Sequence, residues 1–327
     1  MITQTNLLII KNQDVRELMD FEKAKQIILD TYILHEKQQT ILPNSIFLKP
    51  DNRNRIIGLP AYVKGEVDAL GIKWVASFPG NVNNNLHRAS AIIILNDIKT
   101  GYPYCVFEGT YISFFRTSCG AYLVAEKLFQ GRKINQIGIV GAGDIANSFL
   151  ECFRIFNSLQ SDKFKVYDIN PEQSKKFIKK NHLLPESISD NIEDVLQSSD
   201  LIIFATTAGA PHVFRNYFSH NPVILNISLR DIASDIIMSS FNIVDDIDHI
   251  NKENTSINLT YKDAGNLNFI KGTIAQLLLN ELAVDANKPI IISPFGLGIL
   301  DIAIAKYIYE MAIIKSKGLN IDDFFSE

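Results

Sequence analysis

The sequence has few of the features that mark several large classes of protein. Its three cysteines, Cys105, Cys119 and Cys152, are too few and too scattered for a disulfide framework or a zinc site. No apolar run approaches the roughly 18 residues that a membrane span needs, and the first residues lack the basic segment and cleavage site of a secretory signal. A net charge of −4 gives no reason to expect binding to nucleic acid or to an anionic membrane. We therefore expect a cytoplasmic protein with no nucleic-acid partner and no membrane partner.

What the sequence does contain is a strand–turn–helix pattern between residues 136 and 168. Residues 137–140 form a short apolar run typical of a buried strand, and Gly-Ala-Gly-Asp-Ile-Ala follows directly. The first glycine permits a tight turn, the second lets a pyrophosphate approach the backbone, and Ala146 lets the new helix pack close to the strand. The helix N-terminus offers backbone N–H groups to a diphosphate. The positions expected to contact this part of a dinucleotide are Gly141, Gly143, Asp144 and Ile145.

An acidic residue completes the pattern and indicates which dinucleotide binds. The next apolar strand, residues 164–167, ends at Asp168, roughly 20 residues beyond the glycine motif. A carboxylate there accepts hydrogen bonds from both ribose hydroxyls and repels a 2′-phosphate. We therefore expect NAD rather than NADP as the cofactor.

The order of strand and helix patterns predicts two domains of different kinds. From residue 126 onward, apolar strands alternate with helical segments, and the expected strands are residues 137–140, 164–167, 201–205, 223–227, 243–244 and 290–292. Earlier in the chain, a helix is expected over residues 13–38 and another over 109–129. Between them lie strands joined by short turns, at residues 46–48, 56–63, 69–75, 91–95 and 104–107. An amphipathic helix over 301–315, packed on the first domain, and a frayed acidic tail are expected to end the chain.

We therefore predict an α/β fold that contains a doubly wound parallel (Rossmann) sheet and a second, α+β domain. Residues 126–301 form the NAD-binding domain. Residues 1–125 together with 302–327 form the other domain, with an antiparallel or mixed sheet.

Four charged residues lie where charge is uncommon, and each has two interpretations. Lys73 lies within an apolar strand, where it either faces water or acts as a cation that holds a substrate carboxylate or polarises a carbonyl or water. Arg88 follows a loop and Arg116 lies in an apolar helix; each either forms a structural salt bridge or binds an anion, a substrate carboxylate or the diphosphate. Asp231 follows a buried strand, where it either caps a helix over 232–240 or acts as a general acid and base beside the nicotinamide.

The remaining polar residues predict structure rather than chemistry. Asp235, Asp245 and Asp246 are expected to be surface or cap residues. The six histidines show no spacing typical of metal ligands, so no metal site is predicted.

The chain resembles the ornithine cyclodeaminase/μ-crystallin family over nearly its whole length. The segments that carry the resemblance are Gly71-Ile-Lys-Trp74, Arg88-Ala-Ser90, 92–97, Gly101-Tyr-Pro103, Glu108, Arg116-Thr117, Gly141-Ala-Gly143, 226–231 and 294–298. Segments 88–97 and 226–231 are most similar to the siderophore-pathway branch of the family. Members of that branch make 2,3-diaminopropionate by NAD-dependent oxidation of N-(2-amino-2-carboxyethyl)-L-glutamate.

The resemblance implies roles for individual residues and an assembly for the chain. Lys73 matches the active-site lysine, Arg116 the arginine that holds the substrate carboxylate, and Asp231 the catalytic carboxylate. Arg88 is a further candidate for substrate binding. Positions expected near the cofactor are Thr206, Thr207, Arg116 and Thr117. The family also implies a homodimer, with a substrate-binding and dimerisation domain built from both ends of the chain.

The resulting hypothesis is an NAD-dependent amino-acid dehydrogenase of the diaminopropionate branch, which hydrolyses its imine to 2-oxoglutarate and 2,3-diaminopropionate. Three alternatives stay open: a cyclodeaminase for ornithine or a related amino acid with internally recycled NAD, a ketimine or pyrroline-2-carboxylate reductase, and a non-catalytic, crystallin-type ligand-binding protein.

Two departures from the family pattern matter. Many members carry an arginine in the segment around Asn44, and many carry Glu-Asp where this chain has Leu300-Asp301. A substrate contact and a polar contact near the cofactor are therefore expected to be missing.

Overall fold

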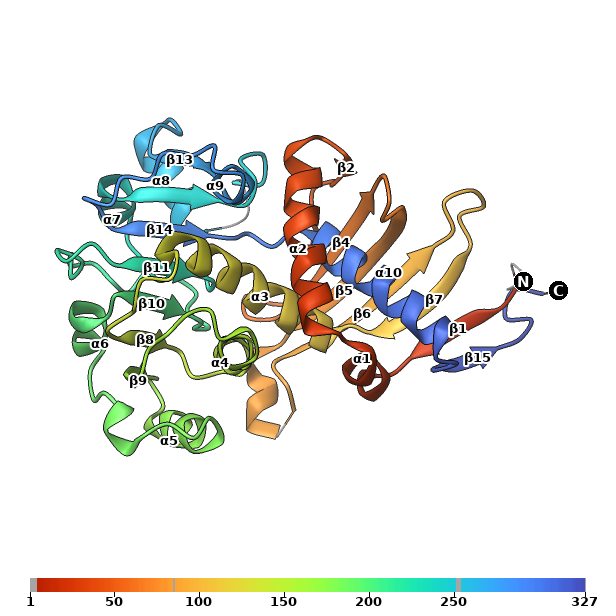
Figure 1. Cartoon of the computed structure of the whole chain (residues 1–327), viewed down its shortest axis with the longest axis horizontal. Helices are drawn as coiled ribbons and strands as arrows, with labels where there is room; N and C mark the ends of the chain where they lie inside the picture. The colour runs from red at the N-terminus through yellow and green to blue at the C-terminus, as the bar shows by residue number, and fades with distance from the viewer. Residues whose placement is uncertain (1–4, 85, 251–253, 327) are drawn as a thin grey trace. The chain divides into compact units, whose positions relative to one another are not determined.

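The computed structural model describes residues 5–84, 86–250 and 254–326, and the chain divides into two units (Figure 1). Unit 1 comprises Met1–Arg116 and Leu297–Glu327, and unit 2 comprises Thr117–Gly296. The sequence placed these boundaries at 125/126 and 301/302. The first observed boundary lies inside one long helix, α3 (Thr110–Phe129), so no turn or change in composition marks it.

Unit 1 is built on a mixed sheet. Its strands are β1 (Leu7–Ile10), β2 (Thr40–Ile41), β3 (Ile46–Leu48), β4 (Arg55–Val63), β5 (Ala69–Ser77), β6 (Ala89–Asn96), β7 (Pro103–Glu108) and β15 (Leu319–Ile321). The order is β15-β1-β7-β6-β5-β4-β2, and β3 also pairs with β4. Neighbouring strands are antiparallel except for β1 and β7, which are parallel. The helices of this unit are α1 (Asn12–Leu18), α2 (Phe21–Glu36), α10 (Gly298–Ile314), the first residues of α3 and a 3₁₀ turn, η1 (Pro79–Asn84).

Helix α10 covers one face of this sheet. It packs against β4, β5 and β6 and also against α2, so its residues 298–305 are all buried. The sequence predicted an amphipathic helix here, and that prediction is wrong because partners on two sides leave this part of the helix no water-facing stripe.

Two other local predictions for unit 1 need correction. The helix expected over 13–38 is two helices, α1 and α2, and Asp20 caps the second by accepting a hydrogen bond from the Lys23 backbone N–H at 3.0 Å. The tail expected to fray instead forms β15, which pairs antiparallel with β1.

Unit 2 is a doubly wound parallel sheet, which confirms the predicted fold class. Its strands are β8 (Ile137–Val140), β9 (Phe164–Tyr167), β10 (Leu201–Phe204), β11 (Val223–Asn226), β12 (Phe241–Val244), β13 (Ile270–Thr273) and β14 (Ile290–Ser293), in the order β13-β12-β14-β11-β10-β8-β9. All neighbouring pairs are parallel. The helices are α4 (Asp144–Phe156), α5 (Pro171–Lys180), α6 (Ile192–Ser198), α7 (Ser234–Ser239), α8 (Ser256–Ala264) and α9 (Ile274–Leu278), with a 3₁₀ turn, η2 (Pro185–Ser187). β13 was not among the predicted strands.

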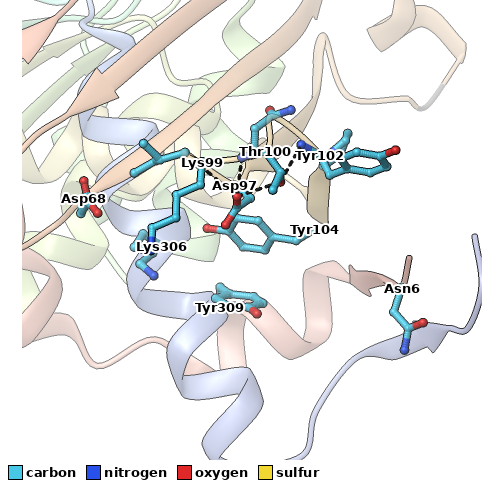
Figure 2. A pocket seen from close by; sticks show the side chains of 12 residues that line it. Asn6, Asp68, Asp97, Lys99, Thr100, Tyr102, Tyr104, Lys306 and Tyr309 are labelled. Atoms are coloured by element: carbon cyan, nitrogen blue, oxygen red, sulfur yellow. Dashed lines mark hydrogen bonds between the residues drawn. The ribbon is translucent and has the colours of Figure 1, made fainter. Parts of the chain in front are cut away.

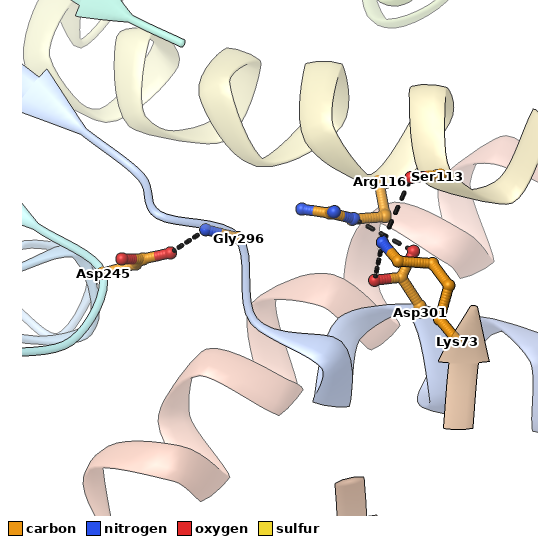
Figure 3. Close-up of polar contacts among 6 residues, drawn as sticks. All are labelled: Lys73, Ser113, Arg116, Asp245, Gly296 and Asp301. Carbon is orange, nitrogen blue, oxygen red and sulfur yellow. Dashed lines mark hydrogen bonds and ion pairs between the residues drawn. The ribbon is translucent and has the colours of Figure 1, made fainter. Parts of the chain in front are cut away.

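Buried acidic and sulfur-containing side chains complete the description of the core. Asp245 was expected at the surface or at a cap; it is 2% exposed, and its carboxylate accepts hydrogen bonds from the backbone N–H groups of Phe295 and Gly296 at 2.9 and 2.8 Å. It therefore fixes the loop that follows β14 (Figure 3). The three cysteines are buried and form no disulfide.

Candidate active site

The strand order of unit 2 creates a topological switch point, the place where open α/β sheets bind ligands. β9 and β10 lie on opposite sides of β8, so the chain leaves β8 toward one side of the sheet and leaves β10 toward the other. Gly141 follows β8 with a φ of +91°, and a Cβ atom there would lie 2.7 Å from the carbonyl carbon of Ala205, after β10. Only glycine allows the two loops to approach this closely.

The start of α4 is shaped to accept a diphosphate. Gly143 is the N-cap residue of α4, and no side chain caps the helix there. Among the residues that the structure describes, none would lie within 4 Å of a Cβ atom on Gly143, so the backbone at this position borders open space. The hydroxyl of Ser118, on α3, donates to the Ile145 carbonyl at 3.2 Å and holds the first turn of the helix in place. An uncapped helix N-terminus beside open space fits a pyrophosphate.

Asp168 is positioned to select the ribose. Its two carboxylate oxygens accept hydrogen bonds from the backbone N–H groups of Ala142 at 2.8 Å and Asn170 at 2.9 Å. These bonds fix the carboxylate at the glycine turn. Each oxygen keeps a second acceptor site, which a ribose hydroxyl can use. The residues present therefore fit a dinucleotide with a free ribose diol.

Asp231 lies buried in a network of polar side chains after β11. The residue is 0% exposed. The hydroxyl groups of Thr206 and Ser228 donate to its carboxylate, and Nε2 of His212 lies 2.9 Å from Oδ1. The interpretation of Asp231 as a helix cap is wrong, because α7 begins at Ser234 and no side chain caps it.

The other predicted cofactor positions take different environments in unit 2. Thr206 uses its hydroxyl on Asp231, whereas the neighbouring Thr207 is exposed. Thr117 is half-buried at the start of the unit, on α3. Asp144 is in the first turn of α4, half-buried.

Unit 1 contains a buried cluster of three charged groups (Figure 3). Lys73 comes from β5, Arg116 from α3 and Asp301 from the first turn of α10. Lys73 Nζ lies 2.6 Å from one carboxylate oxygen of Asp301, and Arg116 Nε lies 3.1 Å from the other; the side chains are 2%, 10% and 0% exposed, in the order Lys73, Arg116, Asp301. Lys73 also donates to the hydroxyl of Ser113 at 3.1 Å. The interpretation of Lys73 as a water-facing residue is therefore wrong.

Local structure explains why these side chains meet. Ser113 and Arg116 are three residues apart on α3, so they share one face of the helix. Gly298 lets the start of α10 approach β4 closely, because a Cβ atom there would lie 3.1 Å from the Leu59 Cβ and carbonyl oxygen. Asp301 lies in the same first turn of α10, so the close approach of the helix to the sheet places its carboxylate beside Lys73.

The cluster has capacity for an anion. It holds two cations and one carboxylate. Within the described part of the chain, Arg116 makes its hydrogen bond through Nε alone, and its terminal nitrogens point away from Asp301 (Figure 3). A guanidinium fixed through Nε, with both terminal groups open, is suited to bidentate binding of a carboxylate.

Arg88 is not brought into this cluster. Its Nη1 donates to the Ser77 hydroxyl at 2.8 Å, at the end of β5. Ser77 is four residues beyond Lys73, which corresponds to about 13 Å along a strand. Asn44, where many family members carry arginine, is exposed.

Sequence reasoning missed two residues of these networks, His212 and Asp301. Asp301 had a visible signal, since an acid in an apolar helix that begins with Gly298 needs a cationic partner. His212 had none, because its contact with Asp231 depends on how the loops after β10 and β11 come together.

The described residues also form a pocket away from these networks. A pocket of about 310 Å³ lies where the β6–β7 turn meets α10 (Figure 2). No predicted site residue lines it, and its Asp97 is used by the turn, where hydrogen bonds from Thr100 and Lys99 lower the pKa of the carboxyl. In the same described ranges, no group of three His, Cys, Asp or Glu side chains is arranged to hold a metal ion. None of the described helices combines the length and hydropathy that a membrane crossing requires.

Comparison with known proteins identifies the family. The model of the ornithine cyclodeaminase/mu-crystallin family matches residues 7–316. The chain belongs to this family. It is 27% identical to N-((2S)-2-amino-2-carboxyethyl)-L-glutamate dehydrogenase of Staphylococcus aureus, over 88% of this chain and 89% of that protein. It is 26% identical to alanine dehydrogenase of Archaeoglobus fulgidus, over 97% of this chain and 98% of that protein.

Solved structures agree with this assignment. Thermococcus litoralis Δ1-pyrroline-2-carboxylate reductase, solved with NADH and L-proline, superimposes with a TM-score of 0.86 at 26% identity, covering 96% of this chain and 100% of that chain. These relatives differ in the reactions that their names state, so membership of the ornithine cyclodeaminase/mu-crystallin family identifies the fold and the class of enzyme and leaves the substrate to be inferred.

Proposed function

We propose that this protein oxidises an N-substituted amino acid, N-(2-amino-2-carboxyethyl)-L-glutamate, to 2-oxoglutarate and 2,3-diaminopropionate. The chain is an NAD-dependent enzyme of the ornithine cyclodeaminase/mu-crystallin family. The observation that supports an amino-acid substrate is the buried Arg116, whose terminal nitrogens are open for a carboxylate. The relative from Staphylococcus aureus, named for the proposed substrate, supports the choice among amino acids.

The proposed reaction balances without any further reactant. Substrate, NAD⁺ and water give 2-oxoglutarate, 2,3-diaminopropionate, NADH and a proton. When bound, NAD accepts the hydride that leaves the glutamyl Cα. The nitrogen loses a proton as the imine forms, and water adds to the imine carbon before the carbon–nitrogen bond breaks.

We assign the protein's part in this reaction to three residues. Arg116 and Lys73 hold substrate carboxylates through charge-assisted hydrogen bonds, and Lys73 is also suited to polarise the water that attacks. Asp231 accepts protons from the substrate nitrogen and from that water, and returns one to the departing amine. Arg88, which donates to the Ser77 hydroxyl at the end of β5, is assigned to a distal carboxylate of the substrate. A siderophore pathway is the proposed setting for the product.

A substrate screen tests the proposal. Purified protein is incubated with NAD⁺ and the proposed substrate, ornithine, alanine or proline, and NADH absorbance is read while products are identified by mass spectrometry. We expect NADH and 2-oxoglutarate in equal amounts from the proposed substrate. Ammonia without net NADH from ornithine would indicate a cyclodeaminase, NADH from alanine or proline would indicate the chemistry named for the other relatives, and no turnover would indicate a ligand-binding protein.

Asp231→Asn tests the proton-transfer role within the same assay. The substitution keeps the shape of the side chain but removes the base. We expect turnover to fall by roughly 10²–10⁴-fold, the usual contribution of general acid–base catalysis, with NAD affinity and melting temperature preserved. Near wild-type turnover in this variant would remove Asp231 from the mechanism.

We also propose that the protein is a homodimer that associates through the face of the unit 1 sheet opposite α10. Ile46, Gly58, Trp74 and Ile92 are paired in register across β3, β4, β5 and β6. Ile46, Trp74 and Ile92 are 58%, 37% and 43% exposed, so a row of large apolar side chains faces water. A continuous apolar patch of this kind marks an interaction surface, and a second copy of the same patch is its simplest partner. The alanine dehydrogenase of a solved archaeal structure is described as a dimer.

Light scattering on size-exclusion peaks tests the dimer. We expect wild-type protein at twice the chain mass and Ile92→Glu as a monomer. Ile314→Glu is the matched control, since Ile314 is 73% exposed at the end of α10, away from the paired row. A wild-type monomer at micromolar concentration, or dimers of the Ile92 variant, would contradict the proposal.

A further inference from the structure

His212 forms a pair with the buried Asp231 carboxylate that joins the interior of unit 2 to solvent. Nε2 of His212 lies 2.9 Å from Oδ1 of Asp231, and the two side chains are 39% and 0% exposed. One member of the pair therefore has no contact with bulk solvent, whereas the other is well exposed to it.

The backbone holds this pair in a fixed geometry. The N–H groups of His212 and Val213 both donate to the Asp231 carbonyl oxygen at 2.9 Å, and Val213 forms a parallel bridge with Ile232. The segment that carries the imidazole is thus bonded directly to the residue that carries the carboxylate. These backbone bonds therefore fix the distance between the two side chains.

The other partners of Asp231 are hydroxyl groups. Thr206 and Ser228 donate to the two carboxylate oxygens and fix their orientation. Among the groups that contact this carboxylate in the described part of the chain, the imidazole is the one with two ring nitrogens, so it can take up a proton at one and release a proton from the other. The other charged residues of the segments around the pair are Arg215, Arg230 and Asp235.

We propose, building on the function proposed above, that His212 relays protons between Asp231 and bulk water. Asp231 takes a proton from the substrate nitrogen or the attacking water. That proton crosses the Oδ1–Nε2 contact to the neutral imidazole, and Nδ1 of the imidazole releases a proton to solvent. The carboxylate is then restored and the imidazole is left as the Nε2–H tautomer. Proton exchange of the exposed ring with solvent returns it to the Nδ1–H tautomer before the next turnover, and no electrons move.

The overall reaction explains why such a relay is needed. Each turnover releases one proton, and the proposed base has no surface from which to pass it to water directly. His212 is a positioning and relay residue in this scheme, since it acts on the substrate through Asp231.

His212→Gln tests the relay, because glutamine keeps a hydrogen-bond donor for Asp231 but cannot carry a proton. The control is His220→Gln, which alters another exposed histidine of unit 2, one whose Nε2 lies 2.9 Å from the Ser199 carbonyl oxygen. We measure kcat and KM across pH, NAD affinity by calorimetry, melting temperature, and rescue by imidazole added to the assay.

We expect His212→Gln to lower kcat by about 100-fold, the lower end of general acid–base effects. KM, NAD affinity and melting temperature should stay at wild-type values. The pH profile of kcat should change shape, and added imidazole should restore part of the rate. His220→Gln should match wild type throughout.

Each other outcome has a definite meaning. Unchanged kcat and pH profile in His212→Gln, with an active wild-type enzyme, overturn the relay alone. Loss of kcat together with melting temperature, without imidazole rescue, assigns His212 a structural role and also overturns it. Absence of turnover by the wild-type protein overturns the proposed function and the relay with it.

Discussion

Asp301→Asn should destabilise unit 1 strongly, because it leaves two buried cations without their carboxylate. Lys73 and Arg116 lie 2.6 and 3.1 Å from Asp301, and all three side chains are at least nine-tenths buried. Asparagine has the same shape, so the loss is one of charge and not of packing. Removing one partner of a buried ion pair costs about 3–5 kcal/mol of the free energy of unfolding.

Urea unfolding followed by tryptophan fluorescence measures this loss. Trp74 is the single tryptophan of the chain and lies next to Lys73 on β5, so its emission reports on unit 1. With a urea dependence of about 1–3 kcal/mol per molar, the midpoint should fall on the order of 2 M at fixed protein concentration. The matched control is Glu17→Gln, which breaks the ion pair with Lys317 in the same unit. That pair is 2.7 Å long, but both side chains are 42% exposed, so its loss should barely move the midpoint.

A second substitution tests whether uncompensated buried charge, and not a change in packing, causes the loss of stability. Lys73→Met placed in the Asp301→Asn protein removes one of the two stranded cations, and it should recover part of the lost stability. An Asp301→Asn midpoint equal to that of the Glu17 control, or no recovery in the double variant, would refute the argument from buried charge.

Further predictions concern the cofactor site and one tyrosine. Gly143→Ala should weaken NAD binding in calorimetry without changing the melting temperature, because the added methyl group meets no protein atom within 4 Å and enters the space left for the diphosphate. Gly141→Ala should lower the melting temperature, because its methyl group would lie 2.7 Å from Ala205; equal behaviour of the two variants would contradict this account of the turn. Asp168→Ser should reduce the ratio of NAD to NADP affinity by about tenfold or more, since a carboxylate no longer repels the 2′-phosphate, and an unchanged ratio would remove Asp168 from cofactor selection. Burial raises the pKa of Tyr309 to about 12, so the folded state keeps a proton that the unfolded state loses near pH 10. This contribution to the free energy of unfolding is present below pH 10 and is lost between pH 10 and about 12. Tyr309→Phe should therefore make the decrease in the free energy of unfolding over this pH range shallower in urea titrations. The same decrease in the variant and in wild type would show that the phenol does not contribute.

Local patterns predicted the parts of this protein that depend on neighbours in sequence. The strand, glycine turn and helix around Gly141 lie within a few residues of one another, and the structure contains them as predicted. The family, the doubly wound fold class and NAD as cofactor are confirmed. The roles of Lys73, Arg116 and Asp231 stay predictions, and so do the domain boundaries given by the sequence.

The features that the sequence did not predict depend on contacts between distant residues. Asp301 is 228 residues from Lys73, and His212 is 19 residues from Asp231 in another loop. No periodicity or spacing records such pairs. The wrong predictions have the same origin: α10 is buried by elements that come from other parts of the chain, and β15 is held by the first strand.

The pairing of β1 with β15 also has a consequence for how the protein is made. The two ends of the chain are bonded to each other: the Asn6 amide donates to Asp322 at 3.0 Å, and the Phe325 N–H donates to the Thr5 carbonyl at 3.1 Å. During synthesis, unit 2 is complete once residue 296 has emerged, whereas the sheet of unit 1 still lacks α10 and β15 at that point. The face of the N-terminal sheet that α10 covers therefore stays uncovered until residues 298–314 have followed the inserted unit. A circular permutant that joins residues 5 and 326 by a short linker and opens the chain at the unit boundary would make the segments of unit 1 contiguous in sequence.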